Sequence, residues 1–305
     1  MKIYHSVEEF EKVDNAVVTT GTFDGVHVGH LKIINRLREV ADAINGETVL
    51  LTFLPHPRIV LFSDDDLKLI CTKNEKIALL EKAGINHLII HPFTREFSRL
   101  SSIEFVRDIL VNKIGTNRLV IGYNHHFGRN REGTFEHLKK CGPVYGFQVE
   151  EISALDVDQV EVSSTKIRQA LDQGQIKTAR RYLMHDFSLT GIVVKGSHLG
   201  HKIGFPTANI KVADPHKIIP ANGVYSVQVL ARNQFYSGML NIGVRPTLGG
   251  TEKTIEVHII DFDKDVYGEE LTLVFDDWIR AEQKFESLDA LKIQIEKDKQ
   301  EVLNR

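Results

Sequence analysis

The stretch from Gly21 to His30 constrains this chain most, because it combines three glycines and two histidines in one short segment. The residues just before it, 15–20, are rich in β-branched and apolar side chains, which is typical of a strand. After it, apolar side chains recur at helical spacing from Leu31 to Ile44, and Gly46 follows as a helix end. The stretch is therefore predicted to be a turn from a strand into a helix.

A turn of this kind suits a phosphate group. Gly21, Gly25 and Gly29 let the backbone bend and approach a ligand, and a helix start offers N–H groups and the positive end of a dipole. His27 and His30 flank Gly29, so both imidazoles can reach one anion and donate to it as charge develops. The alternative is a pair of capping or surface histidines. The glycines, the strand and the helix favour the phosphate site.

Composition places the chain among ordinary globular proteins. A length of 305 residues predicts about two domains, and 42% hydrophobic with 26% charged residues is usual for a soluble protein. A net charge of -3 gives no general attraction to nucleic acid or anionic membranes. We find neither a signal peptide nor a membrane-length apolar stretch, and Cys71 and Cys141 lack zinc-site spacing. A cytoplasmic protein with reduced thiols and no nucleic-acid or membrane partner is expected.

Strand and helix patterns alternate through the first half of the chain. Capping boxes at Thr72 with Glu75, and at Ser101 with Glu104, predict two helix starts. Strands alternating with helices imply a parallel sheet covered on both faces. Ligands bind such sheets beyond the carboxyl ends of the strands. Further strands are predicted at 47–53, 87–90, 118–122 and 147–152.

Three more clusters follow predicted strands or open a helix. His56 lies between two prolines, as a third imidazole near phosphate or as part of a rigid surface turn. The loop 122–133, which includes Asn124, mixes aromatic rings, amides and two arginines, as a flat ligand with a phosphate requires. Its two adjacent histidines have no carboxylate or thiol at metal-ligand spacing. The segment 162–168 places Lys166 and Arg168 in the first turn of a helix, where cations conflict with the dipole unless polyphosphate binds.

These clusters, with Gly-Thr-Phe-Asp-Gly-Val-His-Val-Gly-His, resemble FMN adenylyltransferase, the first half of bacterial bifunctional FAD synthetases. The shorter His-x-Gly-His resembles the nucleotidyltransferase superfamily, whose members attack the α-phosphate of ATP. The resemblance implies a Rossmann-like domain in which His27 and His30 are catalytic. A class I aminoacyl-tRNA synthetase would need a Lys-Met-Ser-Lys-Ser-like loop, which is absent. The nucleotide-binding residues implied are Gly21, Phe23, Asp24, Gly25, His56, Asn124, Ser163, Ser164, Thr165 and Arg168.

The pattern changes at Phe187, where helical spacing gives way to short strands. Such strands predict a small antiparallel barrel, with Arg232 and Asn233 at a hairpin tip. A final helix is predicted from near Ser287, with Leu288, Leu291, Ile295 and Val302 facing the core. We therefore predict an α/β first domain over 1–185 and a β-barrel second domain over 186–305. The predicted strands are 188–194, 223–230, 235–242, 254–260 and 271–275.

The second half has its own glycine loop. Gly196, Gly200 and Gly204 recur every four residues, so backbone amides can approach phosphates; no Gly-Lys-Ser/Thr ends the loop, so it is not a Walker A motif. Its continuation, Gly-Phe-Pro-Thr-Ala-Asn, resembles riboflavin kinase, as do the segments 241–247 and 255–258. Thr207 and Asn209 supply neutral oxygens suited to Mg²⁺ that also carries ATP phosphates.

Glu256 has two interpretations. Ile255, Val257 and Ile259 share one strand face, while Glu256 and His258 share the other. If the barrel interior lay on the Glu256 side, the cost of burying a carboxylate there would point to a catalytic base. Otherwise Glu256 faces solvent on an amphipathic strand. Periodicity leaves both open, and the kinase resemblance implies that Glu256 accepts the proton of a ribityl hydroxyl.

The whole chain thus resembles a bifunctional flavin cofactor enzyme. The resemblance implies phosphorylation of riboflavin to FMN by ATP, then transfer of AMP to FMN, giving FAD and pyrophosphate, with Mg²⁺ as cofactor. One alternative is a nucleotidyltransferase for another phosphate ester, with an accessory flavin-binding barrel. A second is a catalytically inactive flavin sensor. The intact histidine pair and the set of Thr207, Asn209 and Glu256 favour the bifunctional enzyme. The oligomeric state is left open.

Overall fold

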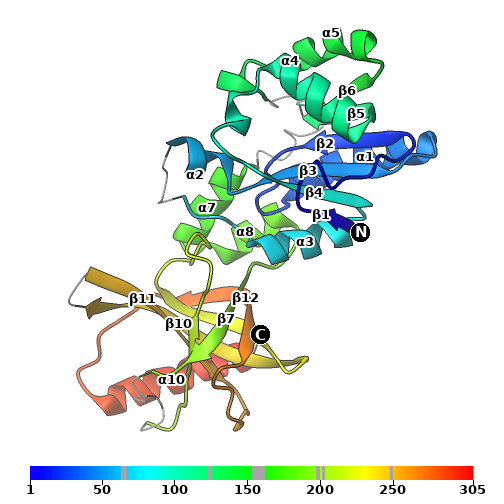
Figure 1. The fold of residues 1–305 in the computed structure, drawn as a ribbon. Coiled ribbons are helices and arrows are strands. Elements are labelled where there is room, and N and C mark those ends of the chain that lie inside the picture. Colours follow the sequence, from blue (N-terminus) through cyan, green and yellow to red (C-terminus); the bar gives the residue numbers. More distant parts are fainter. Residues whose placement is uncertain are drawn as a thin grey trace. The chain divides into compact units, whose positions relative to one another are not determined.

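Figure 1 shows a computed structural model of the chain, which describes residues 1–62, 67–122, 126–152, 162–196, 200, 203–247 and 250–304. The chain divides into two compact units, Met1–Ser164 and Thr165–Arg305. Within the described ranges, no helix is long and apolar enough to cross a membrane.

The first unit is built on a parallel sheet of six strands, in the order β1-β4-β3-β2-β5-β6. Successive residues Val17 and Val18 point to opposite faces, and each belongs to a different apolar cluster. The predicted sheet with two covered faces is therefore confirmed. The strands are β1 (Lys2–Tyr4), β2 (Ala16–Thr20), β3 (Thr48–Leu54), β4 (His87–Pro92), β5 (Thr116–Gly122) and β6 (Gln148–Ile152).

Helices cover the two faces of this sheet (Figure 1). On one face, α1 (Val28–Ala43) and α3 (Lys73–Lys82) bury Ile34, Leu37 and Leu80. On the other, the π-helical η2 (Phe105–Ile114) and α5 (Phe135–Tyr145) bury Val106, Leu110 and Leu138. Both predicted capping boxes are present, at the starts of α3 and of α4 (Ser102–Glu104), which runs into η2.

Three elements of the first unit were not predicted. Helix α2 (Pro57–Phe62) begins at the second proline of the presumed turn, at a first-turn position that proline tolerates. Helix α5 contains Pro143 near its end, which masked its helical pattern. Strand β1 is only three residues long, too short to show alternation. The short helices η1 (Phe97–Arg99) and η3 (Arg129–Arg131) also belong to the unit.

The second unit contains a closed antiparallel barrel in the order β10-β11-β8-β7-β12-β9. Arg232 and Asn233 both have positive φ, 50° and 63°, as a two-residue hairpin requires, so the predicted tip is confirmed. Strand β8 was missed because it is short and follows the glycine loop. The strands are β7 (Ser188–Val194), β8 (Ala208–Lys211), β9 (Gly223–Ala231), β10 (Gln234–Thr247), β11 (Gly250–Ile259) and β12 (Glu270–Arg280).

Among the described residues, the helices α7 (Ser164–Asp172), α8 (Ile176–Leu183) and α10 (Leu288–Leu303) accompany the barrel. Helix α10 begins after Ser287, as predicted, and packs Ile295 and Val302 against the barrel. The prediction that Leu288 faces the core is wrong, because this first residue of the helix is 57% exposed. The helix instead buries Asp298, which accepts hydrogen bonds from Arg280 of β12.

Candidate active sites

A cleft of about 1120 Å³ opens in the first unit at the carboxyl ends of the strands. It begins at Thr20, the last residue of β2, and reaches Gly122, the last residue of β5. This is the edge at which parallel sheets bind ligands. The predicted nucleotide-binding and catalytic residues that line it are Gly21, Phe23, His27, His30, His56, Ser163 and Ser164.

The two histidines of the turn lie against each other in this cleft. His27 occupies the N-cap position of α1 without a capping hydrogen bond from its side chain, and its ring stacks on that of His30, with centroids 3.7 Å apart. The Phe23 ring adds a contact to His30 at 4.8 Å. Burial lowers the pKa of His30 well below its ordinary value, and the positive charges of His27 and Lys76 lower it further. The buried Nδ1 of His30 has no hydrogen-bond partner among the described residues.

Asp24 and Gly25 do not line the cleft but hold the turn from behind. The buried Asp24 carboxylate accepts hydrogen bonds from the backbone N–H groups of Ile70 and Cys71, at 3.0 and 3.3 Å. The Gly25 N–H in turn donates to the Cys71 sulfur at 2.9 Å. These bonds tie the turn to the segment before α3. The predicted contact of Asp24 and Gly25 with nucleotide stays a prediction.

The segment that opens α7 meets the same turn. The Ser164 hydroxyl donates to the Asp24 carbonyl oxygen at 3.0 Å, so this serine lies beside the histidine turn. Thr165 and Arg168 belong to the second unit, so their predicted contacts with ATP stay predictions. Asn124 lies outside the described residues.

Sequence reasoning missed several aromatic residues that line the cleft, and they are called its aromatic wall. The rings of Phe53, Phe93 and Phe97 are 5.5 to 5.8 Å apart between centroids. Phe105 and Phe127 continue the same wall. A signal for this wall was present in the sequence. Aromatic residues directly follow β4, just as the predicted site clusters directly follow other strands. Arginines also line the cleft, so it suits a flat ring with an attached phosphate; they are Arg58, Arg99, Arg129 and Arg131.

In the second unit, Glu256 lies in a row of polar side chains on the outer face of the barrel. It is paired across the strands with Asn209 of β8 and with Asn241 of β10, and all three are half-buried. Directly paired residues have Cβ atoms roughly 5 Å apart. The interior lies on the opposite side, where Ile255 and Val257 are buried. Sequence reasoning had not singled out Asn241 as a site residue.

The predicted glycine loop lies over this polar row. The backbone of Gly196 contacts the Asn209 amide so closely that a Cβ there would collide with it. A Cβ at Gly200 would meet the Phe205 carbonyl and come 3.2 Å from the Thr207 hydroxyl oxygen. Gly204 has a φ of +87°, which few other residues adopt. The described part of the loop therefore lies beside Thr207 and Asn209, and residues 197–199 and 201–202 lie outside the described part. The predicted roles of Thr207, Asn209 and Glu256 stay predictions.

His258 anchors the end of this loop. Its Nδ1 lies 2.7 Å from the Pro206 carbonyl oxygen, and its ring meets that of Phe205 edge-on. Burial lowers the pKa of His258, against the opposing effect of the hydrogen bond to Pro206. His258 therefore serves to hold the residues before Thr207.

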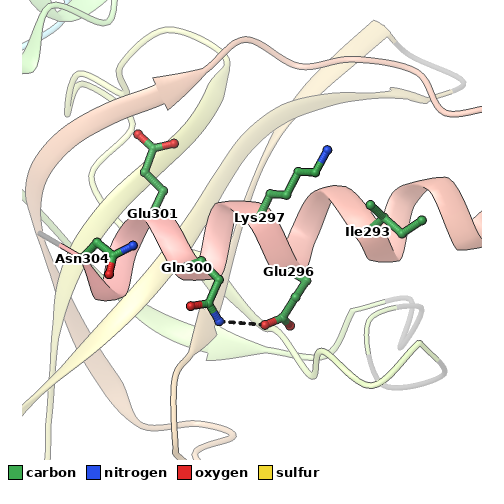
Figure 2. Close-up of a pocket in the computed structure, with 6 residues that line it drawn as sticks. All are labelled: Ile293, Glu296, Lys297, Gln300, Glu301 and Asn304. Atoms are coloured by element: carbon green, nitrogen blue, oxygen red, sulfur yellow. Dashed lines mark hydrogen bonds between the residues drawn. The ribbon is translucent and has the colours of Figure 1, made fainter.

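A second hollow, of about 750 Å³, runs along α10. Figure 2 shows that its six lining residues all come from this one helix, where Gln300 donates to Glu296 at 3.0 Å. It is open to solvent and contains none of the predicted site residues.

Comparison with known proteins gives matches over both units. The family model for FAD synthetase matches residues 9–166, and that for riboflavin kinase matches residues 183–305. The bifunctional riboflavin kinase/FMN adenylyltransferase of Escherichia coli (strain K12) is 36% identical over 302 residues, covering 98% of this chain and 96% of that protein. The Pseudomonas fluorescens protein of the same description is 38% identical, covering 92% and 90%.

The fold has a counterpart among solved structures. A crystal structure described as a macrolide-efflux protein from Streptococcus pneumoniae matches with a TM-score of 0.90 and 30% identity. The match covers 99% of this chain and 98% of that one, so the two chains share both units.

Proposed function

We propose, from the premise that this chain belongs to the bifunctional riboflavin kinase/FMN adenylyltransferase family, that its two sites divide the two reactions between them. The protein phosphorylates riboflavin to FMN and transfers AMP from ATP to FMN, giving FAD and pyrophosphate. We assign adenylylation to the cleft of the first unit and phosphorylation to the polar row on the barrel. The observation that carries this assignment is that each unit has its own glycine-rich segment beside a group of polar side chains.

In the cleft, the start of α1 and the stacked pair of His27 and His30 would receive the phosphates of ATP. The free Nδ1 of His30 supports this assignment, because a buried polar atom needs a partner. A neutral imidazole donates a hydrogen bond without the cost of burying a charge. As the FMN phosphate attacks the α-phosphate, such donors would stabilise charge developing on the departing pyrophosphate.

The aromatic wall of the cleft would hold FMN. Phe53, Phe93 and Phe97 offer flat apolar surface for the isoalloxazine ring. Arg99 and Arg129 line the same cleft, so they can meet the phosphate that makes the attack. With rings, cations and histidines in one cleft, both substrates can be held together for the attack.

On the barrel, Glu256 would act as the general base that accepts the proton of the ribityl hydroxyl. Thr207 and Asn209 would hold Mg²⁺ with the phosphates of ATP. Their neutral oxygens beside one carboxylate fit this ion, which keeps water and phosphate ligands rather than a full protein cage. Bound Mg²⁺ would neutralise the phosphates. Asn241, on the other side of Glu256, would orient its carboxylate.

We place the domain boundary at residue 186, giving domains of 1–185 and 186–305. The start of the riboflavin kinase match at residue 183 supports this position. Helices α7 and α8 nevertheless group with the barrel in the contacts of the chain. Because both reactions use ATP, we also propose a cytoplasmic location.

The test is to incubate the purified protein with riboflavin, ATP and Mg²⁺ and to separate the flavins by chromatography. FMN should form first and FAD second, and removing Mg²⁺ should stop FMN formation. A parallel incubation with FMN instead of riboflavin isolates the second reaction. Production of an adenylylated ester other than FAD, without FMN formation, would contradict the proposal.

A further inference from the structure

A buried lysine lies behind the histidine turn. Lys76 of α3 is only 7% exposed, and its Nζ donates to the carbonyl oxygen of Thr22 at 2.7 Å. No carboxylate of the described residues forms an ion pair with it. Lysine is rarely buried unless it is paired, because an isolated ammonium loses its hydration. This charge therefore lowers stability, and neither reaction assigned above has used it.

Lys76 helps to set the orientation of one peptide group in the turn. The Thr22 carbonyl also accepts a hydrogen bond from the Thr52 hydroxyl of β3, at 3.2 Å. Because the C=O and N–H of a trans peptide point in opposite directions, the N–H of Phe23 points away from Lys76. Phe23 lines the cleft in a left-handed conformation, with φ +47°. Among the described residues, its N–H has no acceptor.

The charge of Lys76 also reaches the imidazoles. It contributes to the low pKa of His30, after burial and His27, so the ammonium and the stacked rings share one electrostatic environment. Lys76 itself does not line the cleft, whose lining among the described residues includes arginines but no lysine. Lys76 is thus a fixed positive charge behind the histidines, and an incoming polyphosphate would supply its missing counter-charge.

We propose that Lys76 is a positioning residue for adenylylation. It holds the Thr22–Phe23 peptide so that the Phe23 N–H faces the ATP phosphates, and its charge adds to the attraction for them. The inference rests on the assignment of adenylylation to this cleft. A lysine that only supported the turn would be replaceable by an apolar side chain of similar length, since Thr52 still bonds the Thr22 carbonyl.

The experiment compares Lys76→Met with the unaltered protein in three measurements. For FMN and ATP, kcat/KM of FAD synthesis should fall about tenfold or more. Riboflavin phosphorylation, measured on the same sample, should stay unchanged. The melting temperature should stay the same or rise, because a buried charge has been replaced by an apolar chain of similar size. Loss of activity without loss of stability is the signature of the proposed role.

Two variants make the result specific. Lys73→Met removes a charge from the exposed side of the same helix and should leave FAD synthesis unchanged. Lys76→Gln is a second neutral replacement that should repeat the loss. FAD synthesis within twofold of normal in either Lys76 variant would overturn the inference, as would a drop in melting temperature that parallels the lost activity. His30→Ala, assayed alongside, separates the two claims, because normal FAD synthesis in that variant would contradict the assignment of the cleft itself.

Discussion

The imidazole rings of His27 and His30 stack with their centroids 3.7 Å apart and their planes at 15°. Two protonated rings at this distance would repel each other, and burial further disfavours charge. The pKa of His30 is accordingly held well below its ordinary value. His30 therefore presents a neutral imidazole to the cleft at physiological pH.

His30→Ala should reduce FAD formation from FMN by about a hundredfold or more, because it removes a donor from the developing charge. Riboflavin phosphorylation should remain near normal, since the barrel carries that reaction. Flavin chromatography with FMN or riboflavin as substrate measures both. His5→Ala, an exposed histidine of the same unit, is the matched control. Equal losses in both reactions would point to misfolding instead.

Acidification should destabilise the first unit through His30. Between the low native pKa and the ordinary value of about 6.5, the unfolded chain binds more protons than the native chain. The free energy of unfolding therefore falls as the pH decreases through this window. His30→Gln cannot titrate, so it should lose less stability between about pH 7.5 and about pH 5.5. Thermal unfolding of both proteins at the two pH values provides the measurement, and identical losses would show that His30 titrates normally.

Glu256→Gln keeps the shape of the side chain but removes its basicity. FMN formation should fall by about two orders of magnitude or more, while supplied FMN should still become FAD. Glu270→Gln, at an exposed position on β12, should leave both rates unchanged. A kinase rate within a few-fold of normal in the Glu256 variant would assign this residue a structural role.

Asp298→Ala should detach α10 from the barrel. The buried carboxylate accepts from the Arg280 guanidinium at 2.7 and 3.0 Å and from the Gln294 amide at 2.8 Å. Removing it leaves Arg280 without a counter-charge, which costs about 3 kcal/mol or more. Urea unfolding monitored by circular dichroism should show the loss. Asp289→Asn, in the exposed first turn of α10, should change stability little.

A fragment of residues 186–305 should fold and convert riboflavin to FMN with Mg-ATP, but make no FAD. A fragment of residues 165–305 should melt at a higher temperature. It adds the buried side chains of Ile176, Ala179 and Leu183, and an ion pair between Lys177 and Asp277 at 2.7 Å. A folded but inactive shorter fragment would mean that earlier residues complete the kinase site. FAD production by either fragment would show that adenylylation has been assigned to the wrong half of the chain.

Local sequence signals determined most of the secondary structure. The capping boxes at Thr72 and Ser101 and the tip at Arg232 and Asn233 were all predictable. Each depends on side chains within a few residues, which act in the same way in almost any fold. The histidine turn was also predictable as a strand-to-helix connection, because glycine spacing and apolar periodicity are properties of the local chain.

Tertiary structure alone decided which of these side chains face a ligand. Asp24 binds the backbone of Ile70 and Cys71 behind the turn, and Lys76 reaches Thr22 from a different helix. The alternation of apolar and polar side chains along β11 does not say which strand face points into the barrel. Only the closed barrel shows that Val257 faces the interior and Glu256 the outer side. Burial and pairing depend on which distant segments pack together, and the free energy of that packing belongs to the whole fold rather than to any short stretch.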